Sequence, residues 1–278
     1  MIDAHLHIGH MGRSIENTIG HIDGIGAEKA VFLPIETADR EYEWLTETVA
    51  QAHERYPDRV IPFCHVDVTR DDAVAELERR AATGVFRGYG EQKQHLPLNH
   101  PGLERVLAFC NEMRWPVTWH FQEGSRGYNQ GIAHLETLVH KFRDIRFIGH
   151  AQSWWSNISA EVPPPEETLY PTGPVVPGGL ADRLLSDYEN VYADLSAGSG
   201  LGAITRDEAF GRDFLKRHRR KLLFATDCPC VDGRGTDYPP GCFAAKSLPF
   251  LRRMVDDPEA LEDILHRNAV RVIGLEGN

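Results

Sequence analysis

Short apolar runs typical of β-strands alternate along this chain with longer stretches that have the periodicity of amphipathic helices. Such alternation predicts a parallel sheet whose strands are joined by helical crossovers. Eight strands are predicted, at residues 2–7, 30–33, 60–65, 85–89, 116–120, 146–150, 191–194 and 222–226. Predicted helices include residues 40–56, 71–82, 101–113, 131–142, 206–218 and 243–255, and residues 257–275 are predicted to form a closing helix and strap.

The same alternation fits either an open, doubly wound sheet or a closed (β/α)8 barrel. The number of runs and the placement of polar residues favour the barrel, because His and Asp residues stand at the carboxyl ends of the predicted strands, where barrel enzymes build their active sites. The length of 278 residues is close to the roughly 250 residues typical of this fold. We therefore predict an α/β protein with a single domain, a (β/α)8 TIM barrel over residues 1–278.

The charge and the cysteines restrict where the protein works and what it binds. A formal net charge of −11, with no block of Lys and Arg, disfavours nucleic-acid binding and favours a small-molecule substrate. The five cysteines form no dense disulfide pattern, no basic segment precedes an apolar stretch at the start, and no apolar run is long enough to span a membrane. These features predict a cytoplasmic protein without membrane contact, and a homo-oligomer is possible.

The candidate ligands are histidine and aspartate residues at or just after the carboxyl ends of four predicted strands. His5 and His7 form a His-x-His pair whose side chains, together with that of Asp3, are expected on one face of the first strand because side chains in a strand alternate. Such a pair by itself is a weak sign of a metal site, and packing explains any single member of the set. Their shared position at one rim of the barrel predicts a common metal site, formed by His5, His7, His120, His150 and Asp227.

The sequence resembles the amidohydrolase superfamily, and within it the amidohydrolase-2 branch, which also contains metal-dependent decarboxylases of aromatic and unsaturated acids. The resemblance covers essentially the whole chain and rests on DAHLH in the first strand, on His120, His150 and Asp227, and on the closing RNAVRVIGL. It implies that His5, His7, His120 and Asp227 bind a divalent metal, with zinc the expected ion. It also implies that His150 binds a second metal or orients the attacking water.

Glu91 and Lys93 follow the fourth predicted strand in the segment GYGEQKQH. Two-metal members of the superfamily usually carry a bridging carboxylated Lys or a Glu at this strand, and the Gly-Glu pair resembles the bridging Glu of the TatD-like branch. Glu91 is therefore a candidate metal ligand, and the site would hold one or two ions. The alternative is a solvated carboxylate after a strand, which leaves a mononuclear site.

Hydrolysis is the leading prediction for the reaction. Water at an open position of the metal can be activated, with Asp227 as general base, while the metal or His150 polarises the carbonyl of an amide, ester or lactone. The alternative is non-oxidative decarboxylation of an aromatic or unsaturated carboxylic acid at the same site, because the fold does not fix the reaction. A TatD-type nuclease and a binding protein without catalysis are opposed by the acidic charge and by the complete set of ligands.

Three further features complete the predictions. The pair Cys228 and Cys230 beside Asp227 offers thiolates for zinc, but Cys-x-Cys is not the usual Cys-x-x-Cys spacing, so packing is favoured. Residues 161–179, rich in Pro and Gly, are predicted to be an irregular surface loop, with a lid or subunit contact as the alternative. Candidates for clamping a substrate carboxylate or stacking on a ring are Arg87, Lys93, His95, Arg126, Tyr128, Trp154 and Trp155.

Overall fold

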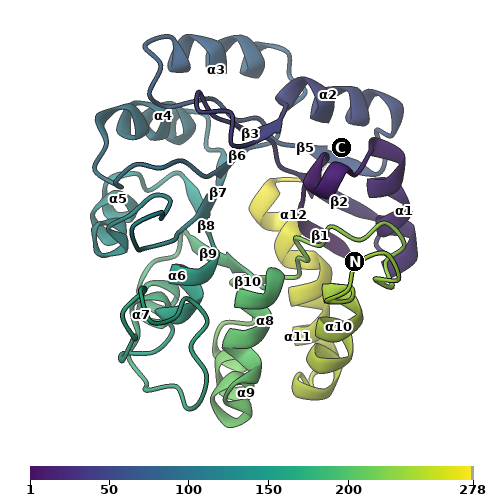
Figure 1. Ribbon diagram of the computed structural model, residues 1–278, viewed down its shortest axis with the longest axis vertical. Helices are drawn as coiled ribbons and strands as arrows, with labels where there is room; N and C mark the ends of the chain where they lie inside the picture. Colours follow the sequence, from purple (N-terminus) through teal and green to yellow (C-terminus); the bar gives the residue numbers. More distant parts are fainter. Residues whose placement is uncertain (277–278) are drawn as a thin grey trace.

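The computed structural model of the protein describes residues 1–276, in which eight parallel strands form a ring (Figure 1). Three of them are hydrogen-bonded in the order β1-β2-β5 and five in the order β10-β9-β8-β7-β6. The strands are β1 (Ile2–Leu6), β2 (Lys29–Phe32), β5 (Val60–Pro62), β6 (Tyr89–Gln92), β7 (Pro116–His120), β8 (Arg146–His150), β9 (Val191–Asp194) and β10 (Leu222–Leu223).

Backbone hydrogen bonds at two seams close the ring into a barrel. Between β5 and β6, Cys64 N donates to Gly88 O at 3.0 Å and Gly90 N donates to Cys64 O at 2.9 Å. Between β10 and β1, Ala4 N donates to Phe224 O at 2.9 Å, and the first and last strands lie side by side in Figure 1. The predicted TIM barrel is confirmed.

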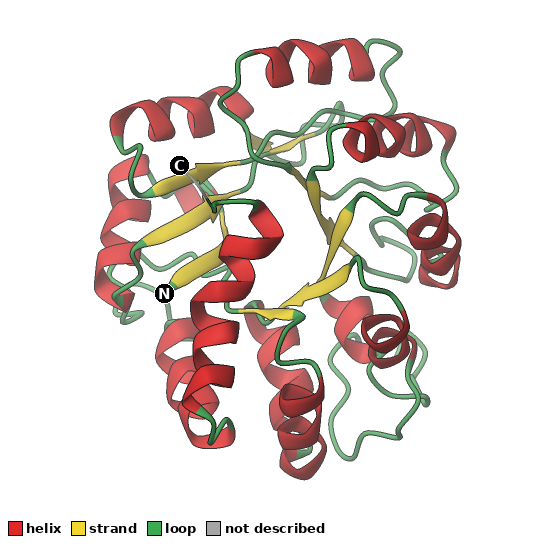
Figure 2. Cartoon of the chain, turned by 180° about the vertical axis from the view of Figure 1, so that it is seen from behind, coloured by secondary structure: helices red, strands yellow, loops and turns green. Residues whose placement is uncertain are grey.

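Most helices lie outside the ring in both views, whereas the last helix of the chain lies against the ring itself (Figures 1 and 2). Side-chain caps fix some of their starts: Ser14 accepts a hydrogen bond from Asn17 N at α1, and Asp207 accepts one from Phe210 N at α9. The helices are α1 (Ile15–Ile25), α2 (Thr46–Arg55), α3 (Ala73–Ala82), α4 (Pro101–Glu112), α5 (Leu135–Lys141), α6 (Gln152–Ser156), α7 (Leu180–Asp187), α8 (Ala197–Thr205), α9 (Glu208–Arg217), α10 (Phe243–Met254), α11 (Pro258–Glu262) and α12 (Asn268–Ile273). Within residues 1–276, no helix combines the length and the apolar character that crossing a membrane requires.

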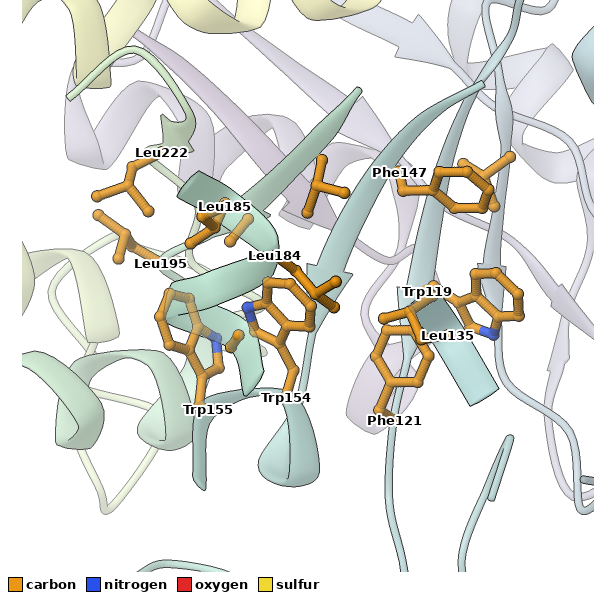
Figure 3. Close-up of a cluster of buried hydrophobic side chains, with 14 of the residues drawn as sticks. Trp119, Phe121, Leu135, Phe147, Trp154, Trp155, Leu184, Leu185, Leu195 and Leu222 are labelled. Carbon is orange, nitrogen blue, oxygen red and sulfur yellow. The ribbon is translucent and has the colours of Figure 1, made fainter. Parts of the chain in front are cut away.

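Two hydrophobic layers hold the strands in place. Inside the barrel, buried side chains from β1, β2, β5, β8 and β10 form a cluster with Ala269, Val272 and Ile273 of α12. Between the strands and the outer helices lies a larger cluster, in which Trp119 and Phe147 stack on neighbouring strands with ring centroids 5.9 Å apart (Figure 3). Apolar residues fill the inside of the barrel at the end against which α12 packs. The polar residues at the carboxyl ends of the strands lie at the opposite rim.

Several predicted boundaries are corrected by the structure. The fourth strand was expected at residues 85–89, but β6 runs from Tyr89 to Gln92, so that Glu91 lies within the strand. The helix expected from residue 40 begins at Thr46, because the preceding residues form a hairpin of β3 (Ile35–Glu36) and β4 (Glu43–Trp44). The closing segment holds α11, α12 and a turn of π-helix (Asp263–Arg267). Residues 161–179 form no helix or strand, as predicted.

Candidate active site

A register shift in β1 aims two histidines into the barrel. The pairing with β2 slips by one residue between Asp3 and Leu6, which interrupts the alternation of faces. His5 and His7 both point to the inner rim, whereas Asp3 lies on the other side, where its Oδ2 is 3.9 Å from Nε2 of His21 in α1. The expected common face for Asp3, His5 and His7 is therefore wrong, because the irregularity reverses the side-chain direction after Asp3.

The rings of His5 and His7 are held with their Nε2 atoms 3.0 Å apart. His7 Nδ1 donates to Leu33 O at 2.7 Å, and since a carbonyl only accepts, the neutral ring has a lone pair on Nε2. His5 Nδ1 lies 2.8 Å from Asp194 Oδ2, which selects the same tautomer. Two lone pairs facing each other at this distance repel unless a proton or a metal ion lies between them. Burial acts to lower the pKa of His5, but Asp194 and Asp227 raise it well above its usual value, so the pair is a site that attracts a cation.

Glu91 is buried within β6, and its two oxygens face different histidines. Oε2 lies 3.2 Å from His7 Nε2 and 3.8 Å from His5 Nε2. Oε1 lies 2.7 Å from His120 Nδ1 and 3.4 Å from His150 Nε2. The carboxylate therefore lies between two pairs of nitrogen donors.

Asp227 follows β10 and completes the cluster. Its Oδ1 is 3.5 Å from His7 Nε2 and 4.0 Å from His5 Nε2, and its Oδ2 is 3.8 Å from His150 Nε2. The side chain of Asp227 is 19% exposed, compared with 2% for Glu91, so Asp227 is the carboxylate that faces the solvent side. The structure thus brings together all six predicted ligands, His5, His7, Glu91, His120, His150 and Asp227.

The electrostatics of this cluster favour a bound cation. Burial acts to raise the pKa of Glu91, but His120, with His5 and His7, holds it well below its usual range. Burial acts in the same direction on Asp227, and the surrounding histidines, first His5 and His7, lower its pKa. Both carboxylates are therefore ionised at neutral pH, and their negative field is concentrated where the imidazole lone pairs meet.

Asp194 is a site residue that the sequence analysis missed. It ends β9, is fully buried, and spans two of the ligands: Oδ2 lies 2.8 Å from His5 Nδ1 and Oδ1 lies 3.0 Å from His150 Nδ1. Ser196 Oγ donates to Oδ1 at 2.6 Å. Burial acts to raise the pKa of Asp194, but His150 and His5 lower it far more. Its place at the end of predicted strand 191–194 was the available signal, equivalent to that of His120 and His150.

The cluster opens into a cavity of about 460 Å³, within the range of small-molecule sites. The hairpin of β3 and β4 supplies Trp44, whose ring centroid is 4.5 Å from that of His7, and Tyr42 just before it. Tyr170, from the irregular loop 161–179, also lines the cavity, so this loop contributes to the site. The lining comprises His7, His10, Tyr42, Trp44, Glu91, Lys93, His120, His150, Ala151, Gln152, Tyr170, Ala197, Gly198, Ser199, Asp227, Pro229, Tyr238 and Phe243.

Lys93 brings a positively charged side chain into this cavity. Its Nζ lies 4.2 Å from the centroid of the Tyr42 ring and 5.0 Å from that of Tyr128. Burial acts to lower the pKa of Lys93, but Glu91 and Tyr42 outweigh it and raise the pKa. The side chain is therefore an ammonium group, suited to a substrate carboxylate.

Tyr128 and His95 lie beside Lys93 but do not line the cavity. Tyr128 donates to Glu41 Oε1 at 2.6 Å, and its ring stacks on that of His95 with centroids 4.2 Å apart. His95 lies 2.8 Å from Glu41 Oε2. These three residues support the wall on which Lys93 rests.

Four other predicted substrate contacts are not brought to the cavity. Arg87 precedes β6 and so lies toward the amino end of that strand, away from the rim, because the strand begins later than expected. Trp154 and Trp155 of α6 are buried in the outer hydrophobic cluster (Figure 3), since the chain turns outward directly after β8. Arg126 is exposed in the loop after β7 and is absent from the lining of the cavity.

A TIM barrel whose rim joins four histidines to two ionised carboxylates has the architecture of a metal-dependent barrel enzyme. The sequence matches the family model described as Amidohydrolase over residues 2–275. The chain therefore belongs to the amidohydrolase family, the amidohydrolase-2 branch, whose members are metal-dependent enzymes. A comparison with curated proteins finds no match.

Solved structures share the fold at low sequence identity. A TIM-barrel protein from Bordetella bronchiseptica is 18% identical with a TM-score of 0.65, covering 94% of this chain and 83% of that one. A protein from Acinetobacter baumannii, described as a probable 2-pyrone-4,6-dicarboxylic acid hydrolase with citric acid bound, is 15% identical with a TM-score of 0.65, covering 98% of each chain. A 5-carboxyvanillate decarboxylase from Novosphingobium aromaticivorans, in complex with manganese and 4-hydroxy-3-methoxy-5-nitrobenzoic acid, is 14% identical with a TM-score of 0.58, covering 94% of this chain and 81% of that one.

Proposed function

We propose that the protein is a metal-dependent hydrolase that cleaves an amide, ester or lactone bond in a small molecule carrying a carboxylate. The observation that carries the proposal is the convergence of His5, His7, Glu91, His120, His150 and Asp227 at the open rim of the barrel, where their donor atoms lie within hydrogen-bond or ion-pair distance. Lys93 in the cavity wall supplies the preference for a carboxylate.

The donor set supports two ions that share Glu91. One ion would be held by His5, His7, Glu91 and Asp227, and the other by Glu91, His120 and His150. Nitrogen and carboxylate ligands suit zinc, which we take as the resident metal, although manganese accepts the same ligands. When bound, such an ion supplies a Lewis acid that lowers the pKa of water from 15.7 to about 7 and polarises a carbonyl group.

The residues around the cluster divide the remaining work. Asp227, ionised and exposed to the cavity, takes a proton from the attacking water at a carboxylate oxygen and returns it to the leaving group. His150 is oriented by Asp194 and Ser196 so that its Nε2 faces the carboxylates. Lys93 binds the substrate carboxylate, while Trp44 and Tyr42 exclude water from one side of the cavity.

Decarboxylation of an aromatic or unsaturated acid is the second candidate, and two observations favour it. Lys93, together with metal ions held by the cluster, would place positive charge where a carboxylate binds, and the fold is shared with a 5-carboxyvanillate decarboxylase. A carboxylate held by the cluster itself would be the leaving group, whereas one held by Lys93 alone would serve only for binding.

The test combines metal analysis with product analysis. We expect about two rim metals per chain in the wild type and loss of the ion held by Glu91, His120 and His150 in His120→Ala, whereas His140→Ala, on the exposed face of α5, keeps both. Lactones, esters, amides and aromatic acids are then screened with and without a chelator, and released carbon dioxide is measured beside the hydrolysis product. Activity that survives complete removal of the rim metals contradicts the proposal, and stoichiometric carbon dioxide replaces hydrolysis with the second candidate.

A further inference from the structure

A second cluster of metal-ligating side chains lies beside the rim, on the outer side of the first and last strands. It consists of His21 from α1, Cys228 and Cys230 from the loop after β10, and Cys242, which precedes α10. All four residues are buried, and their ligand atoms lie within 4.8 Å of one another. We infer that these residues hold a structural zinc ion, separate from the metals of the rim.

The distances between the ligand atoms of this cluster suit a tetrahedrally coordinated zinc ion. Sγ of Cys230 lies 3.2 Å from Sγ of Cys228 and 3.2 Å from Nδ1 of His21. Sulfur ligands at about 2.3 Å from zinc in a tetrahedron are about 3.8 Å from one another, a small adjustment from the spacing observed. The cysteines are free thiols rather than a disulfide. Three cysteines and one histidine are among the ligand sets of closed, structural zinc sites.

His21 is held in the tautomer that a metal needs. Thr226 Oγ1 donates its hydrogen to Asp3 Oδ2 at 2.6 Å, which leaves the hydroxyl oxygen free to accept from His21 Nε2 at 3.4 Å. The hydrogen of the imidazole is therefore on Nε2, and Nδ1 presents its lone pair to the cysteines. Support of a metal-bound histidine by a carboxylate behind it is typical of metal sites.

Arg13 supplies an independent sign of negative charge in the cluster. Its guanidinium is buried, donates from Nη1 to Cys228 O at 2.6 Å and Cys230 O at 3.0 Å, and donates from Nη2 to His7 O at 2.8 Å. Within residues 1–276, no carboxylate lies within ion-pair distance of Arg13. Asp3 and Asp227 attract the guanidinium from beyond ion-pair distance, and zinc with three thiolates and a neutral imidazole, with a net charge of −1, would add a negative charge beside it that neutral thiols do not.

Close packing of α1 against the loop after β10 brings the ligands together. A Cβ on Gly24 would lie 2.0 Å from Asp232 O, so this contact requires glycine. Asp227 directly precedes Cys228 and has a left-handed backbone with φ of 48°, a conformation that the surrounding loop must hold. The ion therefore joins α1, the loop and the start of α10, and fixes the backbone of Asp227.

Metal analysis of the full chain tests the inference. In the double variant His5→Ala/His7→Ala, dialysed against a chelator, we expect one zinc per chain to remain. Adding Cys242→Ala to this double variant should remove it, whereas adding Cys110→Ala, a buried cysteine of α4 outside the cluster, should not. Absence of zinc from the double variant, or retention of zinc without Cys242, overturns the inference.

The wild type provides a second measurement in case the cysteine variants do not fold. Titration of its thiols with an organomercurial, followed with a zinc-binding dye after the rim metals are removed, should release one zinc per chain. Cobalt substitution should give sulfur-to-cobalt charge-transfer absorption, which rim ligands without sulfur cannot produce. Thiols that react without releasing zinc indicate simple packing of cysteines, and iron in place of zinc contradicts the choice of metal.

Discussion

The rim cluster and the cysteine cluster are separated by a single peptide bond, between Asp227 and Cys228, yet they differ in ligands and in access. The rim offers imidazoles and carboxylates and opens into a cavity of about 460 Å³. The cysteine cluster offers thiols and one imidazole and is buried on every side. Sites of the first kind keep a position for water and substrate, whereas sites of the second kind are closed and stabilise the fold. One loop therefore carries a proposed ligand of each kind of site at adjacent residues.

The substitution Asp227→Asn should separate the two sites most strongly. An amide cannot take a proton from water, so we expect kcat to fall by about 10²–10⁴-fold, the usual contribution of a general base. Zinc at the cysteine cluster and the thermal unfolding midpoint should stay at wild-type values. Steady-state rates and metal content of the same preparation provide the check, and a rate close to that of the wild type removes Asp227 from its role.

The substitution Asp194→Asn tests how the rim ligands depend on the carboxylate that supports them. Because Asp194 orients both His5 and His150, we expect the affinity of the rim for metal to fall by about 10–100-fold. Competition with a chromogenic chelator measures this change, with Asp187→Asn at the exposed end of α7 as the matched control. Equal loss of metal from the cysteine cluster would show that the two sites are not independent.

Lys93→Met should change substrate binding and leave both metal sites intact. Loss of a charge-assisted contact is worth about 1.5–3 kcal/mol, and at its lower end this raises KM about tenfold for substrates that carry a carboxylate. Neutral esters should show no such change, and Lys216→Met on the exposed face of α9 should affect neither class. A uniform change for charged and neutral substrates contradicts the assignment.

His65 is a buried histidine outside both clusters. We expect its ionisation to change the folding stability of the protein and not its activity. Its Nδ1 accepts a hydrogen bond from Glu36 N, and burial, with Arg80, lowers its pKa to about 4 from 6.5. Since the folded pKa lies below the unfolded one, its contribution to stability is complete above pH 6.5 and is lost as the pH falls towards 4. The ionisation of His65 should lower the free energy of unfolding by about 2 kcal/mol between pH 7 and pH 5.

The variant His65→Asn keeps an acceptor for Glu36 N but does not titrate in this range. Urea unfolding at pH 7 and pH 5 should therefore show a smaller loss of stability in this variant than in the wild type. The exposed variant His140→Asn serves as control and should follow the wild type. Parallel pH profiles for all three proteins would show that His65 is not the group responsible.

Sequence patterns predicted the strands best where apolar residues lead up to a ligand. The bounds of β7, β8 and β9 agree with the predicted runs because each is hydrophobic up to its final His or Asp. The strand β6 was displaced because it carries buried Glu91 and Gln92, which hydrophobicity cannot identify as a strand. Glu91 is paired with histidines from other strands, and Gln92 is hydrogen-bonded to Tyr89 and Asn129.

The composition of the two clusters was predictable to different degrees. His7, His120, His150 and Asp227 stand at or just after the ends of their strands, a regularity that is visible in the sequence. Asp194 shared that position but was not selected, and Asp3 was placed on the wrong face because a register shift leaves no sequence signature. The cysteine cluster joins His21 to Cys230 across 209 residues, and no local spacing predicts such a meeting.

The seam at which Asp227 N donates to His5 O at 2.9 Å joins the two ends of the ring, and the rim ligands lie on both sides of it. A nascent chain that has not yet emerged beyond β10 has His5 and His7 but neither Asp227 nor the strand that holds it beside them. The complete ligand set therefore forms only after the most distant contact in the barrel is made, the slowest kind of contact to form. We therefore expect the ion held by His5, His7, Glu91 and Asp227 to bind only after the ring has closed, whereas the ligands Glu91, His120 and His150 come from neighbouring strands and do not depend on that contact.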